Sequence, residues 1–262
     1  MENGISFMLR AHNEEATLEQ SIRSLLDGLT IPYEIVVILH LCTDRSEEIA
    51  TRLAAMAPAG TIRIVYYTHP ISRAGYENLA TDEKSCHSMA AYTGWCRNQC
   101  KRRWLFKWDA DFVASPGLLS YLNGREWLAT DGPENVRLSA CNADMTNREV
   151  YLSSALVGYT KFYFWELPLF LRGAVYTDAP ADARIEHVSL LADLKAYWRP
   201  ERGPWYETEE SEEAAQVRER LANLVRDFGP EPTGMARASN PACDSIFLAI
   251  KRSQPAYVRP TA

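Results

Sequence analysis

Strand-like and helix-like patterns alternate along the first 122 residues of this chain. Four β-rich runs fall at 5–10, 33–39, 62–67 and 104–108. Apolar residues at helical spacing fill the intervals, as in the segment 16–27, where one face carries Leu18, Ile22, Leu25 and Leu26. Repeated strand–helix units imply right-handed crossovers and parallel strands. The alternation therefore predicts an α/β fold with a mainly parallel, Rossmann-like sheet covered by helices on both faces.

Capping signals predict where several helices begin. Asp44 and Glu47 have the spacing of a capping box before a helix that reaches Met56. Ser115 and Pro116 are placed as the N-cap and first-turn proline of another helix. Further elements are expected: a helix that runs through Met89 and Trp95 to Cys100, a helix over 209–227 and a strand over 136–141.

The chain shows no internal repeat and no clear linker. Its 262 residues are enough for one large domain with a substantial core. We therefore expect a single domain over residues 1–228, followed by a C-terminal extension, 229–262, that is rich in Pro, Ala and Ser. The extension is a candidate surface for a homodimer.

Composition excludes several classes of partner. A net charge of −6 and a pI near 5.5 argue against binding to nucleic acid or to an anionic membrane. No run approaches the roughly 20 apolar residues of a transmembrane segment, and the first residues lack the basic region of a signal peptide. The six cysteines have neither zinc spacing nor a disulfide framework. Free thiols in a cytoplasmic protein are expected.

Two aspartates follow the fourth β-rich run, as Asp109-Ala110-Asp111. In an extended strand, side chains at i and i+2 point to the same side. Both carboxylates would then face one spot at the carboxyl end of a strand, where open α/β sheets bind ligands. Such oxygen donors suit Mg²⁺ or Mn²⁺, with substrate phosphates completing the coordination shell. Helix capping before Ser115 is the alternative.

Four segments, in their order and spacing, resemble the family-2 nucleotide-sugar glycosyltransferases of GT-A fold. These segments are 5–15, 34–38, 43–46 and 107–111. The family has a Tyr-Asn-Glu-like turn after its first strand, a Ser-Thr-Asp-x-Ser turn after its second, and a metal-binding Asp-x-Asp at the end of its fourth. The resemblance covers about residues 5–122. It implies a nucleotide-sugar and metal-binding half, 1–122, and an acceptor half, 123–228.

The resemblance also implies roles for single residues. Asp109 and Asp111 would hold the metal and the diphosphate, and Asp109 would also reach the ribose. His12 stands where the family often has an aromatic ring near the base, although a polar turn residue beside Asn13 is an equal alternative. The residues expected to contact the nucleotide sugar are Arg10, Ala11, His12, Asn13, Glu14, Leu39, Lys84, Asp109 and Ala110.

Two departures from the family bear on the donor. Leu39-His40 replaces the usual carboxylate pair after the second strand, which puts the common uridine preference in doubt. The region of the family's Arg-Asn-x-Gly motif holds 90–94, Ala-Ala-Tyr-Thr-Gly. Lys84 and Arg73 then become candidate diphosphate contacts, with solvated surface residues as the alternative.

The general base is expected in the second half of the chain. Sugar transfer needs a group that accepts the proton of the attacking hydroxyl. Glu166 ranks first because it lies between Trp165 and Leu167. Apolar surroundings would raise the pKa of its carboxyl group toward the value that a general base needs. A salt-bridged structural glutamate is the alternative. Asp182 ranks second, before the remaining candidates Asp178 and Glu186.

His187 is the best-placed candidate for a third metal ligand, because several GT-A enzymes supply a late histidine. An imidazole beside two carboxylates would favour Mn²⁺ over Ca²⁺. The alternative is a strand-end histidine bonded to a backbone carbonyl. Trp198, Trp205 and Tyr206 are candidates for stacking on an acceptor sugar or for packing.

We therefore expect a metal-dependent glycosyltransferase that moves a sugar from a nucleoside diphosphate sugar to a carbohydrate or other hydroxyl acceptor. Inverting single displacement is implied by the resemblance alone. A sugar-phosphate nucleotidyltransferase is one alternative, but the segment 9–13 lacks the glycines of its phosphate loop. A non-catalytic nucleotide-sugar-binding module is the other alternative, and the intact Asp109 and Asp111 argue against it.

Overall fold

A computed structural model describes residues 2–72, 76–124, 135–142, 147–154, 177–188 and 204–229. The chain divides into two compact units. The first comprises residues 1–69 and 90–200, and the second comprises residues 70–89 and 201–262. This division groups 201–228 with 70–89, whereas the sequence interpretation joins 201–228 to the parallel sheet. The domain boundary at residue 228 stays a prediction.

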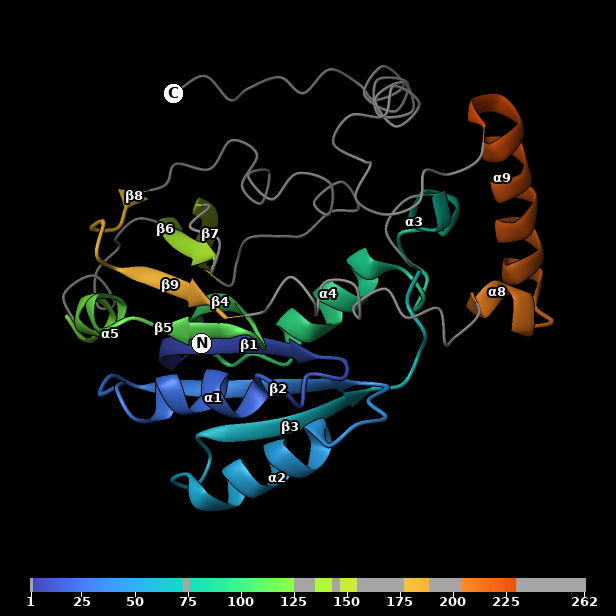
Figure 1. Cartoon of the computed structure of the whole chain (residues 1–262). Helices are drawn as coiled ribbons and strands as arrows, with labels where there is room; N and C mark the ends of the chain where they lie inside the picture. Colours follow the sequence, from blue (N-terminus) through green and yellow to red (C-terminus); the bar gives the residue numbers. More distant parts are fainter. Residues whose placement is uncertain are drawn as a thin grey trace. The chain divides into compact units, whose positions relative to one another are not determined.

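Four parallel strands form the central part of the first unit (Figure 1). They are β1 (Glu2–Ala11), β2 (Tyr33–His40), β3 (Ile62–Tyr67) and β4 (Arg102–Asp109). β1 pairs with β2 on one side and with β4 on the other, so that Phe7 lies level with Ile35 and Phe106. β3 pairs with the outer side of β2. All four β-rich runs of the sequence are thus strands, in the order β3-β2-β1-β4.

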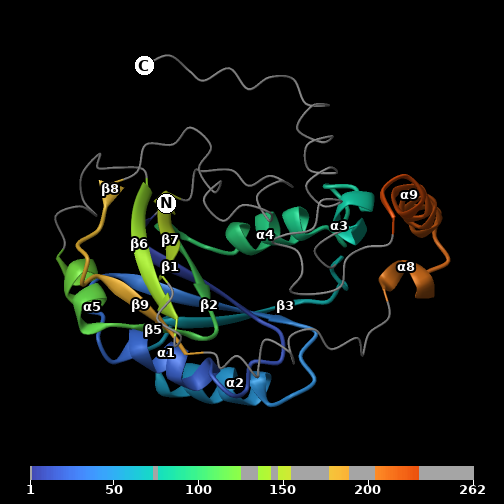
Figure 2. The ribbon, with the colours of Figure 1, turned by 45° about the horizontal axis from the view of Figure 1, so that its top comes forward.

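Helices cover both faces of these parallel strands. Helices α1 (Leu18–Leu26) and α2 (Ser46–Met56) lie on one face, and α4 (Met89–Asn98) lies on the other (Figure 2). Helix α5 (Pro116–Asn123) begins as predicted, because Ser115 Oγ accepts the Leu118 N–H at 3.1 Å and Pro116 occupies the first turn. The α/β fold class predicted from the sequence is confirmed.

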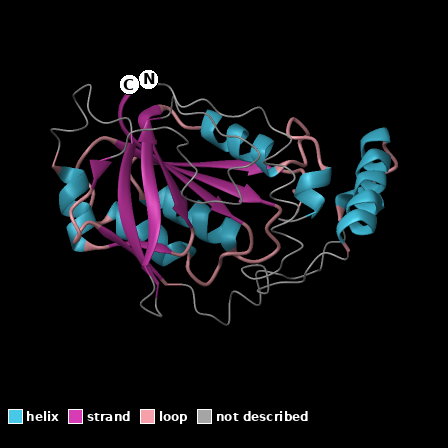
Figure 3. Ribbon diagram, turned by 90° about the horizontal axis from the view of Figure 1, so that it is seen from above, coloured by secondary structure: helices cyan, strands magenta, loops and turns pink. Residues whose placement is uncertain are grey.

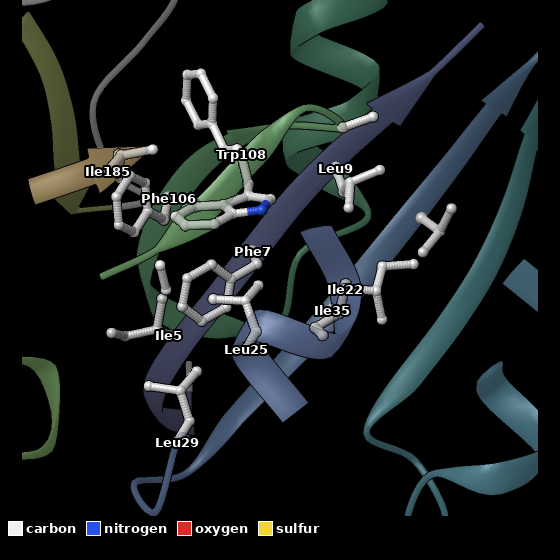
Figure 4. Packing of buried hydrophobic residues seen from close by; sticks show 14 of the residues in the cluster. Ile5, Phe7, Leu9, Ile22, Leu25, Leu29, Ile35, Phe106, Trp108 and Ile185 are labelled. Carbon is white, nitrogen blue, oxygen red and sulfur yellow. The ribbon is translucent and has the colours of Figure 1, made fainter. Parts of the chain in front are cut away.

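An aromatic cluster fills the face that α1 covers (Figure 4). The Phe7 ring lies 5.5 Å from Phe106 and 5.6 Å from Trp108, and all three side chains are fully buried. Trp108 also donates its indole N–H to Ser21 Oγ of α1 at 2.9 Å. Because side chains alternate along a strand, Lys107 belongs to the opposite face, with Asp109 after it.

The second half of the first unit extends this sheet with short strands. They are β5 (Phe112–Ala114), β6 (Asn135–Asn142), β7 (Asn147–Ser154), β8 (Thr177–Asp178) and β9 (Arg184–His187). β7 pairs antiparallel with β4 and β6, and β5 pairs antiparallel with β9. All strands belong to one sheet (Figure 3). The sequence predicts β6, but it does not predict β5, β7 or β8.

The second unit contains α3 (Tyr76–Ala80), α8 (Trp205–Thr208) and α9 (Glu212–Phe228). Ser211 Oγ accepts the Ala214 N–H, which begins α9, and the helix ends at Gly229. The helix predicted over 209–227 is therefore confirmed, with its start three residues later.

Trp205 and Tyr206 are buried inside this second unit. The Trp205 ring stacks on His87 with a centroid distance of 3.8 Å, and its indole N–H donates to Ser72 Oγ at 3.2 Å. The Tyr206 hydroxyl donates to Glu77 Oε1 at 3.3 Å. These contacts favour packing over the stacking on an acceptor that the sequence left open.

No helix within the described ranges is long and apolar enough to cross a membrane. The cysteines whose side chains are described (Cys42, Cys86, Cys96 and Cys100) are free thiols. Burial raises the pKa of Cys96 and of Cys100 to about 12, so these two thiols stay protonated at neutral pH.

Candidate functional site

The carboxyl ends of the four parallel strands meet at one edge of the sheet. β1 ends at Ala11, β2 at His40, β3 at Tyr67 and β4 at Asp109. Open α/β sheets bind their ligands at this edge, beside the point where the strand order reverses. In this chain the order reverses at β1, which lies between β2 and β4. The candidate site is therefore the edge formed by the residues that end or follow these strands.

The loops after β1 and β2 brace each other. Asn13 has a left-handed backbone (φ 60°), and its side-chain oxygen accepts the Thr43 N–H at 2.7 Å. Asp44 accepts the N–H of Glu15 at 2.9 Å and the N–H of Ser46 at 3.0 Å. The capping box expected at Asp44 is wrong, because α2 has Arg45 at its N-cap. The Asp44 carboxylate joins the two loops instead.

Histidine and tyrosine rings gather at this edge. We call them the histidine–tyrosine group, and its members are His12, His40, Tyr67, His69 and Tyr92. The rings of His12 and His40 lie 5.3 Å apart, as do those of His40 and Tyr92. The rings of Tyr67 and Tyr92 are 4.7 Å apart. His12 and His69 are exposed and His40 is half-buried, so their faces can stack on a planar ligand, whereas Tyr67 and Tyr92 are buried.

Hydrogen bonds define the proton positions of two of these histidines. His12 Nδ1 lies 2.6 Å from the carbonyl oxygen of His40, and His40 Nε2 lies 3.0 Å from that of His69. A carbonyl only accepts, so each of these nitrogens donates. In the neutral form of the exposed His12 ring, Nε2 is then the acceptor.

The Asp-x-Asp segment has a different backbone from the one the sequence predicts. Asp109 is the last residue of β4, and Ala110 and Asp111 form a turn that leads into β5. The expectation of an extended strand through Asp111 is wrong, because the chain must turn here for β5 to pair with β9. Ala110 is buried, whereas Asp109 and Asp111 are both partly exposed. That both carboxylates face one spot stays a prediction.

Asp109 forms an ion pair with Lys107. The ammonium nitrogen lies 2.8 Å from each carboxylate oxygen, and the side chains are 18% and 25% exposed for Lys107 and Asp109. Arg10 is the neighbour of Asp109 across β1 and β4. Its guanidinium donates to Thr93 Oγ1 at 3.4 Å and lies 5.8 Å from the Tyr92 ring centre. Two cationic residues thus accompany the first aspartate of the segment.

The strand β9 brings the backbone of His187 to the same turn. His187 lies opposite Phe112 in the β5–β9 pair, and the Val188 N–H donates to the Asp111 carbonyl at 2.9 Å. The side chain of His187 lies outside the described residues. Among the residues that are described, no three His, Cys, Asp or Glu side chains form a group that could hold a metal ion. Metal ligation by His187 stays a prediction.

The acids considered as the general base fall at different places. Glu166 lies outside the described residues. Asp182 precedes β9, and its carbonyl accepts the Ser115 hydroxyl at the start of α5. Asp178 is in β8, level with Arg137 of β6. Glu186 lies in β9 directly before His187 and is exposed. Since β9 spans about 10 Å from Arg184 to His187, Asp182 is at the end of this strand away from Asp111.

The remaining predicted contacts are of three kinds. Ala11, Leu39 and Ala110 are buried in the hydrophobic core, so their main-chain atoms are what they can offer a ligand. Lys84 is exposed in the second unit, and its backbone N–H donates to Asp82 Oδ1. Arg73 and Trp198 lie outside the described residues.

Sequence reasoning missed Lys107, Tyr67, His69 and Tyr92. Lys107 was within reach, because it precedes Asp109 by two residues on a strand and so shares its face. The tyrosines come from β3 and α4, and only the packing of that helix on the sheet brings them together.

No family model matches the sequence, and no curated protein is similar to it at a significant level. Solved structures do match. The 1–349 fragment of TarS from S. aureus matches with a TM-score of 0.52 at 10% identity, over 87% of this chain and 72% of that one. A longer TarS structure gives a TM-score of 0.51 at 10% identity, and the match spans 87% of this chain but only 44% of that one.

The mannosyltransferase PcManGT from Pyrobaculum calidifontis, solved with GDP-Man and Mn²⁺, matches with a TM-score of 0.48 at 14% identity, over 97% of this chain and 81% of that one. Likeness at such low identity concerns the fold. The two TarS matches, with TM-scores above 0.5, show that the chain has a GT-A fold.

Proposed function

We propose that the chain is a metal-dependent glycosyltransferase that moves a sugar from a nucleoside diphosphate sugar to a hydroxyl acceptor by inverting single displacement. One observation carries the proposal. In a GT-A fold, the ion-paired Asp109 ends β4 at the same sheet edge as the histidine–tyrosine group. A carboxylate for a metal and aromatic faces for a base are what a nucleotide sugar requires at this edge.

The donor would lie across the carboxyl ends of the strands. The histidines of the histidine–tyrosine group offer stacking surfaces to the base, and His12 offers an acceptor nitrogen. Asn13 and Glu14 shape the loop beside it, because Asn13 accepts the Thr43 N–H and the Glu14 N–H donates to Ser46 Oγ at 2.8 Å. Arg10, the strand neighbour of Asp109, would contact the diphosphate.

The residues at the turn fit a divalent cation. Asp109 and Asp111 would supply carboxylate oxygens and His187 would supply an imidazole nitrogen, a donor set that suits Mn²⁺ or Mg²⁺. Both oxygens of Asp109 already hold an ammonium group at 2.8 Å, so a positive charge is accommodated there. When bound, the metal would supply charge that stabilises the departing diphosphate.

A carboxylate must accept the proton of the acceptor hydroxyl. Glu166 remains our first candidate for this base. Asp182, the second candidate, lies at the far end of β9, and Glu186, which directly precedes His187 on this strand, belongs to the opposite face from His187. The cytoplasmic location and a homodimer through 229–262 stay predictions.

Binding of nucleoside diphosphates tests the proposal directly. With Mn²⁺ present, at least one of UDP and GDP should raise the thermal unfolding midpoint of the full chain. A ligand at a hundred times its Kd adds about 2.7 kcal/mol of stability. The proposal fails if no nucleoside diphosphate stabilises the chain with either Mn²⁺ or Mg²⁺. Hydrolysis or transfer assays with several donors then separate an enzyme from a binding module.

Replacing His187 with alanine should raise the Mn²⁺ concentration needed for half-maximal transfer, because the ion loses one donor. Loss of an outer-shell partner of a metal ligand commonly costs about 10–100-fold in affinity, and loss of a ligand itself should cost at least as much. Titrating Mn²⁺ against the initial rate measures the change. Arg184→Ala, which changes an exposed side chain at the other end of β9, is the control and should leave the Mn²⁺ requirement unchanged. An unaltered Mn²⁺ requirement in the His187 variant would remove His187 from the site.

We expect that the site does not prefer uridine over other nucleosides in the donor. A site built around a hydrogen bond discriminates strongly between two bases, but an apolar pocket discriminates between them by only about 1–3 kcal/mol. Leu39 is buried and accepts no side-chain hydrogen bond, and His40 donates its Nε2 proton to a carbonyl. We therefore expect either weak selectivity or preference for a purine such as guanine, stacked on His12 or His40. Calorimetry with UDP and GDP in Mn²⁺ decides; UDP binding about a hundredfold tighter would show the expectation to be wrong.

A further inference from the structure

We propose that Lys107 is an internal counter-ion of Asp109 that makes binding of the divalent cation conditional on the nucleoside diphosphate. This inference rests on the proposed function and concerns the regulation of the same site. Nothing in the family resemblance points to Lys107, since the resemblance gives roles to Asp109 and Asp111.

The geometry of the ion pair is that of a bound cation. Lys107 Nζ is equidistant, at 2.8 Å, from Oδ1 and Oδ2 of Asp109. The ammonium therefore straddles both oxygens that a metal would use. Strand geometry maintains the pair, because residues two apart on β4 share one face. A metal that takes either oxygen has to displace this ammonium or crowd against it.

Displacing the Lys107 ammonium from Asp109 is unfavourable when no other anion is present to pair with it. The Lys107 side chain is only 18% exposed, so water does not fully replace the lost carboxylate. The displaced ammonium would also lie close to a divalent cation, and like charges repel strongly where the dielectric is low. Arg10, the strand neighbour of Asp109, adds further positive charge nearby.

A nucleoside diphosphate makes it less costly for a metal ion to displace the Lys107 ammonium from Asp109. Its phosphate oxygens give the displaced ammonium a new anionic partner and give the metal further ligands. Metal and nucleotide then favour each other's binding, and this coupling is reciprocal. Lys107 in this role is a positioning residue, which controls when Asp109 is available.

The test measures Mn²⁺ binding by the full chain, from the loss of the electron paramagnetic resonance signal of free Mn²⁺, without nucleotide and with saturating GDP or UDP, after subtraction of the Mn²⁺ that the same nucleotide chelates in the absence of the chain. In the wild type, the nucleotide should tighten Mn²⁺ binding by roughly 5–150-fold. The Lys107→Met variant keeps the length of the side chain without its charge. It should bind Mn²⁺ alone about tenfold more tightly than wild type, and the effect of nucleotide should fall correspondingly.

Two controls separate this role from general electrostatics. Lys101→Met removes the same charge from an exposed side chain just before the opposite end of β4, and it should leave Mn²⁺ binding at the wild-type level. Lys107→Arg keeps a cation beside Asp109 and should preserve the weak binding of Mn²⁺ alone. Circular dichroism verifies that each variant is folded.

The outcomes distinguish this inference from the proposed function. If the wild type binds no nucleoside diphosphate with Mn²⁺, the proposed function itself fails. If the wild type binds both, but Lys107→Met binds Mn²⁺ alone no more tightly than Lys101→Met, the counter-ion role is overturned. Wild-type Mn²⁺ affinity that does not respond to nucleotide overturns it as well.

Discussion

Replacing Asp111 with alanine is expected to abolish sugar transfer while the fold survives. A metal contributes several kcal/mol to a transition state that carries developing negative charge, and each 1.4 kcal/mol is tenfold in rate. The expected loss in kcat/KM is about 10³-fold or more. Asp109→Ala should impair transfer severely for the same reason, since it removes the other carboxylate of the segment.

The fold should tolerate the Asp111 change because of how this residue is held. The Asp111 side chain is partly exposed in a turn, and the contact that joins it to the residue after β9 is made by its backbone carbonyl. Alanine keeps that carbonyl. Initial rates with Mn²⁺, together with circular dichroism, measure the two effects. Asp27→Ala, which removes an exposed carboxylate at the C-terminus of α1, is the matched control and should retain activity. Full turnover by either site variant in excess chelator would contradict the metal-dependent mechanism.

Truncating Trp108 to alanine is expected to lower the free energy of unfolding by about 3–5 kcal/mol, the usual cost of removing a buried aromatic side chain. The indole is fully buried, and its ring lies 5.2 Å from Phe106 and 5.6 Å from Phe112. The loss also leaves the Ser21 hydroxyl without the indole donor that it now accepts from. The lost packing and the lost hydrogen bond to Ser21 both lower the free energy of unfolding.

Denaturant unfolding followed by circular dichroism measures this loss. Trp95 on α4 is the matched control, because its indole is only partly buried and the same truncation there should cost less. A cost below about 1 kcal/mol at Trp108 would show that the core collapses around the missing ring.

Local patterns were enough to predict much of this fold. Apolar β-rich runs predicted β1 to β4, and Ser115-Pro116 predicted the start of α5, because both signals act within a few residues. The turn at Asp111 could not be predicted in this way. It depends on the pairing of β5 with β9, whose residues lie more than seventy positions further along the chain.

The candidate site was predictable only where one strand supplied it. Asp109 and its strand-mate Lys107 follow from the alternation along β4. The meeting of Tyr67 with Tyr92 depends instead on where α4 packs, and the pattern of that helix does not specify it. At Asp44, one carboxylate oxygen accepts the local Ser46 N–H and the other accepts the N–H of Glu15 from another loop, and a local capping pattern does not predict this second partner.

The discontinuity of the second unit has a consequence for biosynthesis. Ser72 and Trp205, which are hydrogen-bonded in that unit, are 133 positions apart in sequence. At translation rates of about 5–20 residues per second, Ser72 is synthesised roughly 7–27 s before its partner Trp205. During that interval the segment 70–89 has no access to the Trp205 ring that His87 stacks on. A nascent chain is therefore exposed to chaperones and proteases at this segment long after the first three strands have been synthesised.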